Sequence, residues 1–185
     1  MATRECDEPS IRSARARAGR GPWIGAALGV LLAAPAPAYA DEARAVPVAV
    51  LPIKLLDTSG EPTDQTAEHA GRLLRMGEDL SADLTRTGAY RAVYWPAARL
   101  ARSCPAETAA CLLQAAREQE ADLVFIGVVH KSSTLILQLW ARLVDVRSGR
   151  DVFLRDLNFR GDTDEAWQRA RAFLAAQIRE AGSRR

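Results

Sequence analysis

The sequence after residue 40 predicts an α/β domain with one mixed β-sheet of about five strands and three helices. Between residues 45 and 129, apolar runs typical of buried strands alternate with stretches whose apolar residues recur at helical spacing. Between residues 134 and 159, two strand-like stretches flank a turn. The order is therefore β-α-β-α-β-β-β-α, in which short right-handed connections place parallel strands first and an antiparallel hairpin after them.

The first strand and the first helix are expected at residues 45–55 and about 64–87. The strand is a valine-rich apolar run, typical of a strand buried on both faces, although Pro47 and Pro52 limit its hydrogen bonding. The apolar stripe of the helix consists of Ala70, Leu73, Gly77, Leu80 and Leu84. Because glycine in mid-helix costs up to about 1 kcal/mol relative to alanine, we expect Gly77 to allow a close approach to the sheet.

The middle of the domain is expected to contain a short strand, a short helix and the central strand. Tyr90–Trp95 is an aromatic strand that Pro96 stops. The apolar residues that mark the helix are Ala109, Leu112, Leu113 and Ala116. Leu123–Val129 is the most continuous apolar stretch after residue 40, so we expect it to be the central strand, covered on both faces.

The predicted hairpin follows the central strand. Apolar residues at alternate positions from 135 to 143 face one way, whereas Gln138, Trp140 and Arg142 face the other, as in a half-exposed strand. Residues 147–150 form the turn, and residues 151–159 return as a strand whose facing the pattern leaves open.

The last helix is expected to start near Asp162. Asp162 and Glu165 resemble a capping box, in which the side chains satisfy the first amides of the helix. The buried stripe consists of Trp167, Ala170, Leu174 and Ile178.

Residues 1–40 have the three parts of a secretory signal peptide. Arginines between residues 12 and 20 precede an apolar run of about a dozen residues, and a Pro/Ala-rich stretch follows. The small residues Ala38 and Ala40 suit signal peptidase, which places the cut before Asp41. We therefore expect residues 41–185 to form an exported domain, periplasmic or secreted.

A retained membrane anchor is the alternative to a cleaved signal. A spanning helix needs about 20 apolar residues, and Pro35 and Pro37 interrupt this run early, so we expect no stable membrane insertion. Removing residues 1–40 takes away five of the 25 basic residues and three of the 23 acidic ones, which leaves 20 of each. A neutral domain lacks the basic surface of a nucleic-acid-binding protein, so we expect no nucleic-acid partner.

Cys104 and Cys111 are the two cysteines after the signal, and an oxidising compartment favours a disulfide between them. Two residues seven apart on one continuous helix would be about 10 Å apart, too far for a disulfide. Cys104 must therefore lie in a loop that folds back onto the first turn of the helix that contains Cys111. The alternative is a redox pair, although the spacing is not Cys-x-x-Cys.

The motif content of the sequence favours a non-enzymatic protein. The sequence contains no glycine-rich phosphate loop, no zinc-type His/Cys cluster and no nucleophile elbow, so we expect no cofactor and no metal. His69 lies among polar residues of the first helix, where we expect a solvated surface position. His130 ends the central strand, the place where ligands bind in open α/β sheets, although a polar loop role is the simpler interpretation.

Six residues are candidates for binding. They are Asp57, His130, Lys131, Trp140, Arg160 and Asp164. Trp140 beside arginine is typical of a binding surface, unless the last helix covers that face. Acids between residues 162 and 165 could bind a cation or complement the dipole of the helix, and Arg160 could pair with Asp57 or with these acids.

Several stretches together resemble a bacterial family of exported proteins of unknown function. They are Val48–Pro52 with Leu56–Ser59, Ala121–Gly127, His130–Leu137 and Arg160–Trp167. The resemblance covers nearly all of residues 46–181 and implies no catalytic residue. The element order is also similar to the N-terminal domain of TolB and related periplasmic modules that bind other envelope proteins, which implies a shared fold rather than a shared function.

We therefore expect a binding or accessory module that acts through protein–protein contacts, with another envelope protein as its partner. The alternative is a small-ligand or metal-binding protein, in which the loops around Asp57, His130 and Arg160 converge at one edge of the sheet. A third interpretation is a hydrolase that uses His130 with one of the acids.

Overall fold

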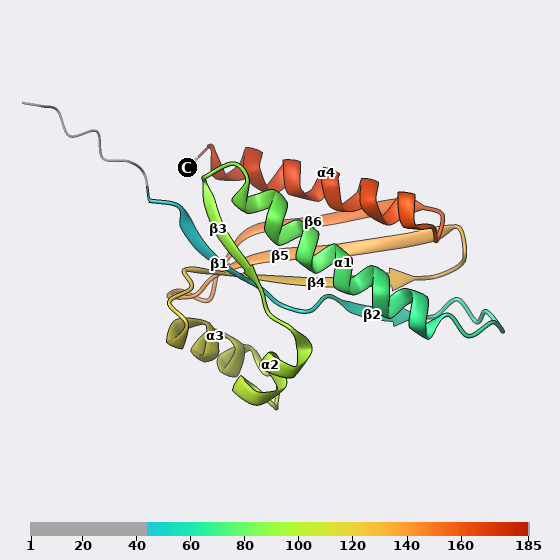
Figure 1. The fold of residues 1–185 in the computed structure, drawn as a ribbon, viewed down its shortest axis with the longest axis horizontal. Coiled ribbons are helices and arrows are strands. Elements are labelled where there is room, and N and C mark those ends of the chain that lie inside the picture. The colour runs from blue at the N-terminus through green and yellow to red at the C-terminus, as the bar shows by residue number, and fades with distance from the viewer. Residues whose placement is uncertain (1–43, 185) are drawn as a thin grey trace, which may run out of the picture. The chain divides into compact units, whose positions relative to one another are not determined.

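The computed structural model describes residues 44–184, which form one six-stranded mixed sheet and four helices (Figure 1). The strands are β1 (Val46–Val50), β2 (Lys54–Asp57), β3 (Tyr90–Tyr94), β4 (Leu123–Lys131), β5 (Ile136–Asp145) and β6 (Asp151–Arg160). The helices are α1 (Thr66–Thr85), α2 (Ala97–Ser103), α3 (Ala109–Glu118) and α4 (Asp164–Gly182). The predicted fold class is confirmed.

The predicted signal peptide lies outside the described residues, together with the expected cleavage site at Ala38, Ala40 and Asp41. Within residues 44–184, none of the helices combines the length and the apolar character needed to cross a membrane.

Two elements differ from the sequence-based expectation. The predicted first strand is split into β1 and β2, because Pro52 lies in the segment between them and cannot donate a backbone hydrogen bond. The short helix α2 was not predicted, since its seven residues are too few for helical periodicity to stand out. The other predicted strands and helices are present within a few residues of their expected bounds.

The sheet has the strand order β3-β1-β4-β5-β6, and β2 runs beside the second half of β4. The pairs among β1, β2, β3 and β4 are parallel, whereas β4, β5 and β6 form an antiparallel meander. The predicted central strand is therefore central, with neighbours on both sides, and β6 is an edge strand.

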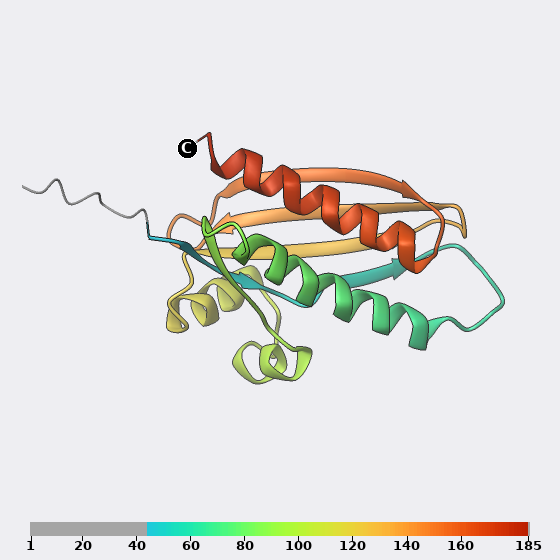
Figure 2. The ribbon, with the colours of Figure 1, turned by 45° about the horizontal axis from the view of Figure 1, so that its top comes forward.

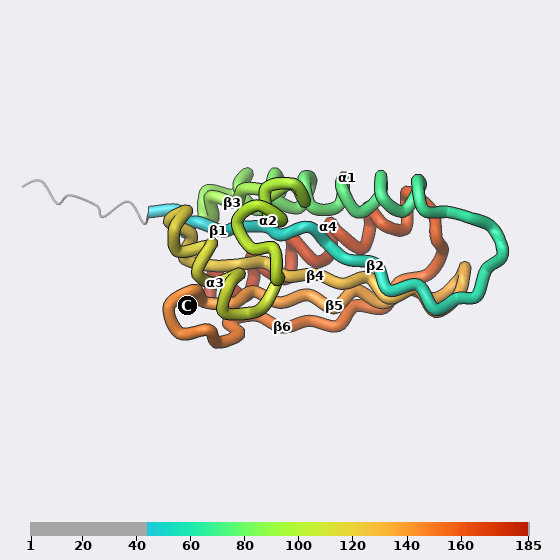
Figure 3. The backbone as a smooth tube through the Cα atoms, turned by 90° about the horizontal axis from the view of Figure 1, so that it is seen from below, coloured from blue at the N-terminus to red at the C-terminus, as the bar shows by residue number. Residues whose placement is uncertain are grey.

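Helices cover the two faces of the sheet unequally. The helices α1 and α4 lie side by side along one face and form the larger core with it (Figure 2). The helices α2 and α3 form a smaller core with the opposite face of β1 and the first half of β4. Figure 3 shows that these two short helices lie at one end of the sheet. Much of that second face is therefore free of helices within the described part of the chain.

Gly77 lets α1 approach the sheet closely, as the sequence predicts. A Cβ atom at this position would lie 2.5 Å from the ring of Tyr94 on β3, a distance at which one of them must move. The absence of a side chain therefore allows the aromatic ring to fit beneath the helix.

The structure contains the predicted disulfide between Cys104 and Cys111, whose Cα atoms are 5.6 Å apart. Cys104 directly follows α2, and Cys111 lies in the first turn of α3, so the chain folds back between them. Thr108 caps α3 by accepting a hydrogen bond from the amide of Cys111. A loop this short gives a stabilisation of about 2–3 kcal/mol.

Candidate functional site

A buried ion cluster lies where β2 and β4 end, beneath the start of α1 and α4. Its centre is Lys131, the last residue of β4, whose side chain is fully buried. The ammonium donates to Glu61 Oε2 at 2.7 Å and to the Gln65 side chain, and it lies 2.9 Å from Asp162 Oδ2. Because an unpaired buried ammonium is strongly unfavourable, these partners are what allow Lys131 to remain charged inside the domain.

Asp162 connects β4, α1 and α4 through its carboxylate, which contacts four side chains. Besides Lys131, it accepts hydrogen bonds from His69 Nε2 at 2.7 Å, Arg72 Nη1 at 2.7 Å and Trp167 Nε1 at 3.0 Å. Burial opposes the ionisation of this carboxyl, but hydrogen bonds from Lys131, His69 and Trp167 outweigh it and lower the pKa of Asp162 to about 2. The carboxylate is therefore ionised throughout the neutral range.

Two sequence-based expectations, for His69 and for Asp162, are wrong. His69 was expected to be solvated, yet it is 3% exposed and takes the place on the buried face of α1 that Ala70 was expected to occupy. Asp162 was expected to cap the last helix, yet the cap is Thr163, whose hydroxyl accepts the hydrogen bond from the Ala166 amide. The signal for His69 was its spacing of four and seven residues before Leu73 and Met76, which places it on the apolar stripe.

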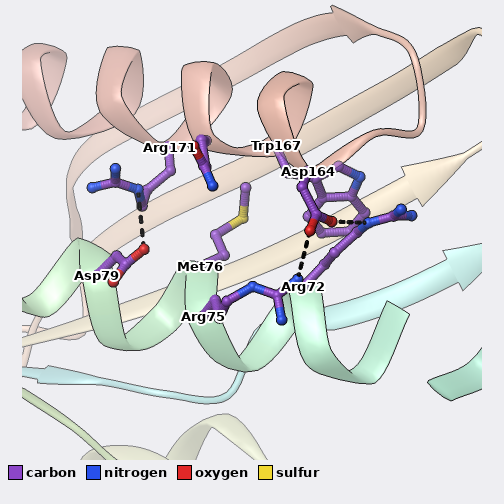
Figure 4. Close-up of a pocket in the computed structure, with 8 residues that line it drawn as sticks. Arg72, Arg75, Met76, Asp79, Asp164, Trp167 and Arg171 are labelled. Carbon is purple, nitrogen blue, oxygen red and sulfur yellow. Dashed lines mark hydrogen bonds and ion pairs between the residues drawn. The ribbon is translucent and has the colours of Figure 1, made fainter. Parts of the chain in front are cut away.

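A cleft of about 290 Å³, open solvent included, separates α1 from α4 beside the cluster. Figure 4 shows Arg72 and Arg75 of α1 directed at Asp164, and Arg171 of α4 directed at Asp79. Each of the three arginines thus has a carboxylate close to it, so the described residues that line the cleft include no free cation to recruit an anion. These pairs link the two helices to each other.

The helix-free part of the sheet exposes a mixed apolar and polar surface, which we call the open face. It is formed by Leu56 of β2, His130 of β4, Ile136, Gln138, Trp140 and Arg142 of β5, and Leu154 of β6. Leu56, Ile136 and Leu154 are 45%, 55% and 64% exposed. The last helix, α4, packs on the opposite face, so it does not cover Trp140. The predicted exposure of the Trp140 face is therefore observed.

Trp140 is held in place by its neighbours on the open face. Its indole ring stacks on the imidazole of His130, with ring centroids 5.4 Å apart. His130 Nε2 lies 2.8 Å from the hydroxyl of Thr58, which follows β2. The strand pairing places Val128 and Asp156 on either side of Trp140. The indole is therefore half-buried and ordered, as an anchor residue of a binding surface is.

The ligand-binding hypothesis required Asp57, His130 and Arg160 to converge, but the structure places these three side chains on two faces of the sheet. Asp57 follows Leu56 in β2, so its side chain lies on the α1 face, where it accepts hydrogen bonds from the amide and hydroxyl of Ser59. His130 and Arg160 lie on the other face. Asp57 thus does not share a site with them, and neither Asp57 nor the acids at the start of α4 has an ion pair with Arg160 in residues 44–184.

The remaining two candidates, Lys131 and Asp164, do not lie on the open face. Lys131 belongs to the buried ion cluster, whereas Asp164 pairs with Arg72 at 2.8 Å and with Arg75 at 3.3 Å. No three His, Cys, Asp or Glu side chains between residues 44 and 184 are grouped as metal ligands would be. Of the buried ion cluster and the open face, the open face is the one with side chains accessible to a partner.

The comparison with known families gives one match. The model of the family DUF3280, described as "Protein of unknown function (DUF2380)", matches residues 46–178. This confirms the expected membership of a family of unknown function. No curated protein matches the chain.

Several solved structures are similar to this fold. PelC from Paraburkholderia phytofirmans, a dodecamer, is 18% identical, with 70% of this chain and 84% of that chain covered and a TM-score of 0.47. Lipoprotein GNA1162 from Neisseria meningitidis is 18% identical, with 72% and 96% covered and a TM-score of 0.45. TolB from Acinetobacter baumannii is 17% identical, with 75% of this chain but 28% of TolB covered and a TM-score of 0.47.

The ion cluster predicts a specific loss of stability in acid. Because the pKa of Asp162 is lowered to about 2, its stabilising effect is complete above the pKa of the unfolded chain, near 4, and is lost as the pH falls from about 5 to about 2. We expect this loss to amount to about 2 kcal/mol. Urea unfolding at a series of pH values measures it, and Asp162→Asn is expected to remove this part of the pH dependence.

At neutral pH, Asp162→Asn is expected to destabilise the fold by about 3–5 kcal/mol, because it takes a charged partner from buried Lys131. Asp164→Asn is the matched control, since Asp164 also pairs with Arg72 but its side chain is 53% exposed. The control is expected to lose less than about 1 kcal/mol. Equal losses in the two variants would contradict the role given to burial.

Proposed function

This chain belongs to the DUF3280 family, and we propose that it is a non-enzymatic module that binds another protein of the cell envelope through its open face. The observation that supports this most is the exposure of large apolar side chains around an ordered tryptophan on the helix-free part of the sheet. Soluble domains seldom leave such side chains grouped on one surface unless a partner covers them.

The arrangement of the open face suits a protein partner. Trp140 lies near the middle of the surface, and Leu56, Ile136 and Leu154 lie around it on three different strands. Gln138 and Arg142 flank Trp140 on β5 and offer polar groups. An aromatic anchor with aliphatic neighbours and polar groups beside it is the composition that protein interfaces favour.

The ion cluster supports binding by fixing the position of this surface. Lys131 is adjacent to His130 in β4, so the two side chains point to opposite faces of the sheet. Anchoring Lys131 among Glu61, Gln65 and Asp162 therefore holds His130, and with it Trp140, on the open face. A surface that is ordered before binding loses less conformational entropy when a partner arrives.

The proposed location is the periplasm or the exterior of the cell. Residues 1–40 support it through their signal-peptide pattern, and the Cys104–Cys111 disulfide is consistent with it because such bonds persist mainly in oxidising compartments.

Leu154→Asp is expected to abolish partner capture, because it places a charge on the exposed apolar part of the open face. The measurement is chemical crosslinking in intact cells, followed by purification and identification of the proteins captured by each variant. Trp140→Ala is expected to weaken capture of the same protein by at least about tenfold, as loss of an anchor residue does.

Leu74→Asp provides the matched control, since Leu74 lies on α1, away from the open face, and is 45% exposed. It is expected to retain the partner. Capture that survives Leu154→Asp and Trp140→Ala, or that is lost equally in Leu74→Asp, would show that the open face is not the binding surface.

The location is tested by the mass of the native protein. We expect the polypeptide recovered from the cell envelope to begin at Asp41, which intact-mass spectrometry measures directly. A native polypeptide that retains residues 1–40 would contradict cleavage and remove the main support for export.

A further inference from the structure

In the sheet formed by residues 44–184, β6 is the last strand and has one unpaired edge. It pairs with β5 on one side, and along residues 154–160 no strand of the described chain pairs with its other side. The amide of Gly161, directly after β6, donates to the carbonyl of Leu135, directly before β5. The alternation of an antiparallel pair therefore turns the backbone groups of residues 154, 156, 158 and 160 away from β5. A long exposed edge of this kind is a template for another strand.

Two opposite charges on this edge have no partner among residues 44–184. The side chains of Asp156 and Arg160 are exposed, and neither makes an ion pair with another described residue. They cannot pair with each other, because four residues along a strand separate them by about 13 Å. Both lie on the same face of β6, two residues on either side of Asn158.

We propose that the partner of this edge is a second copy of the chain, joined by antiparallel pairing of the two β6 strands about a two-fold axis at Asn158. In this register Asp156 of each copy lies opposite Arg160 of the other, so each of these charges gains one partner and the dimer contains two such ion pairs. Asp156, Asn158 and Arg160 are also the residues whose backbone groups point outward, so the register satisfies the hydrogen-bonding pattern of the ladder.

Other registers are less favourable because they oppose like charges or leave these charges unpaired. Shifting the axis to Asp156 or Arg160 places that residue opposite its own copy, and an axis at Arg155 opposes two arginines. An axis at Leu157 sets Asp156 opposite Asn158 and Arg160 opposite Leu154, which pairs no charges. The charges on β6 thus favour one register of the β6–β6 pairing and disfavour the others, as charges on edge strands do.

Apolar side chains on the other face of β6 agree with the same register. An axis at Asn158 places Leu157 opposite Phe159 of the second copy, twice, and both side chains are only half-buried in the single chain. Such cross-strand pairs contribute roughly 0.2–1 kcal/mol each.

Phe173 of α4 gives independent support, since it is 50% exposed. It lies one turn before Gln177, whose side chain accepts a hydrogen bond from Arg155 of β6. One turn of the helix, about 6 Å, corresponds to two residues of the strand, which brings Phe173 level with Leu157 and close to the proposed axis. The second copy would therefore cover an apolar side chain that is otherwise exposed to solvent.

The test is a charge exchange measured by analytical ultracentrifugation of the purified protein over a range of concentrations. The wild-type protein is expected to form a reversible dimer. Asp156→Arg and Arg160→Asp are each expected to raise its dissociation constant about tenfold or more, because each creates two facing like charges. The double variant restores opposite charges and is expected to return close to the wild-type constant.

Arg91→Asp, on the opposite edge strand β3, is the control and is expected to leave the dimer unchanged. Asn158→Cys tests the register separately, because the axis brings the two Cα atoms about 5.5 Å apart, within disulfide range, whereas Leu154→Cys is expected to crosslink no better than the wild type.

A wild-type protein that stays monomeric, a double variant that fails to recover, or a crosslink at residue 154 rather than 158 would overturn the proposal. The proposal does not depend on the proposed function, since Leu154→Asp and Trp140→Ala test capture of another protein, whereas these variants test self-association.

Discussion

The ion pair between Lys131 and Asp162 is the interaction on which this domain depends most. It connects the end of the central strand to the segment before α4, 31 positions later in the chain, and both side chains are almost fully buried. Two charges in such a place are favourable only when further hydrogen bonds satisfy them. Glu61, Gln65, His69, Arg72 and Trp167 supply those bonds, so the pair gathers the loop before α1, α1 itself and α4 around one point. The cluster therefore sets how the two long helices sit on the sheet.

This arrangement explains why the sheet can leave part of one face without helices. The helices α1 and α4 cover one face along its length, while the disulfide-linked pair α2 and α3 covers the other face at one end only. The strands that form the open face are stabilised on their opposite face by the larger core and by the ion cluster. Apolar side chains can then remain exposed on a rigid support, available to a partner, without loss of the fold.

The sequence predicted what depends on neighbouring residues and missed what depends on distant ones. Periodicity predicted the central strand, the alternation around Trp140 and the close approach at Gly77, because each follows from local spacing. It could not pair His69 with Asp162, which are 93 residues apart, so His69 was placed in solvent and Asp162 at a helix cap. It also grouped Asp57 with His130, because both lie at the ends of predicted strands. The sequence did not show that their side chains point to opposite faces of the sheet.

Hydrogen exchange of single amides in wild-type protein and in Asp162→Asn tests the central role of the ion pair most directly. The Thr58 amide donates to the Lys131 carbonyl and the Ser132 amide to the Ile136 carbonyl, beside the cluster, whereas the Trp95 amide donates to the Val50 carbonyl far from it. We expect the substitution to open the strand ends locally and to speed exchange at Thr58 and Ser132 much more than at Trp95, under conditions in which global unfolding does not limit exchange. Equal acceleration at all three amides, or none, would contradict the account.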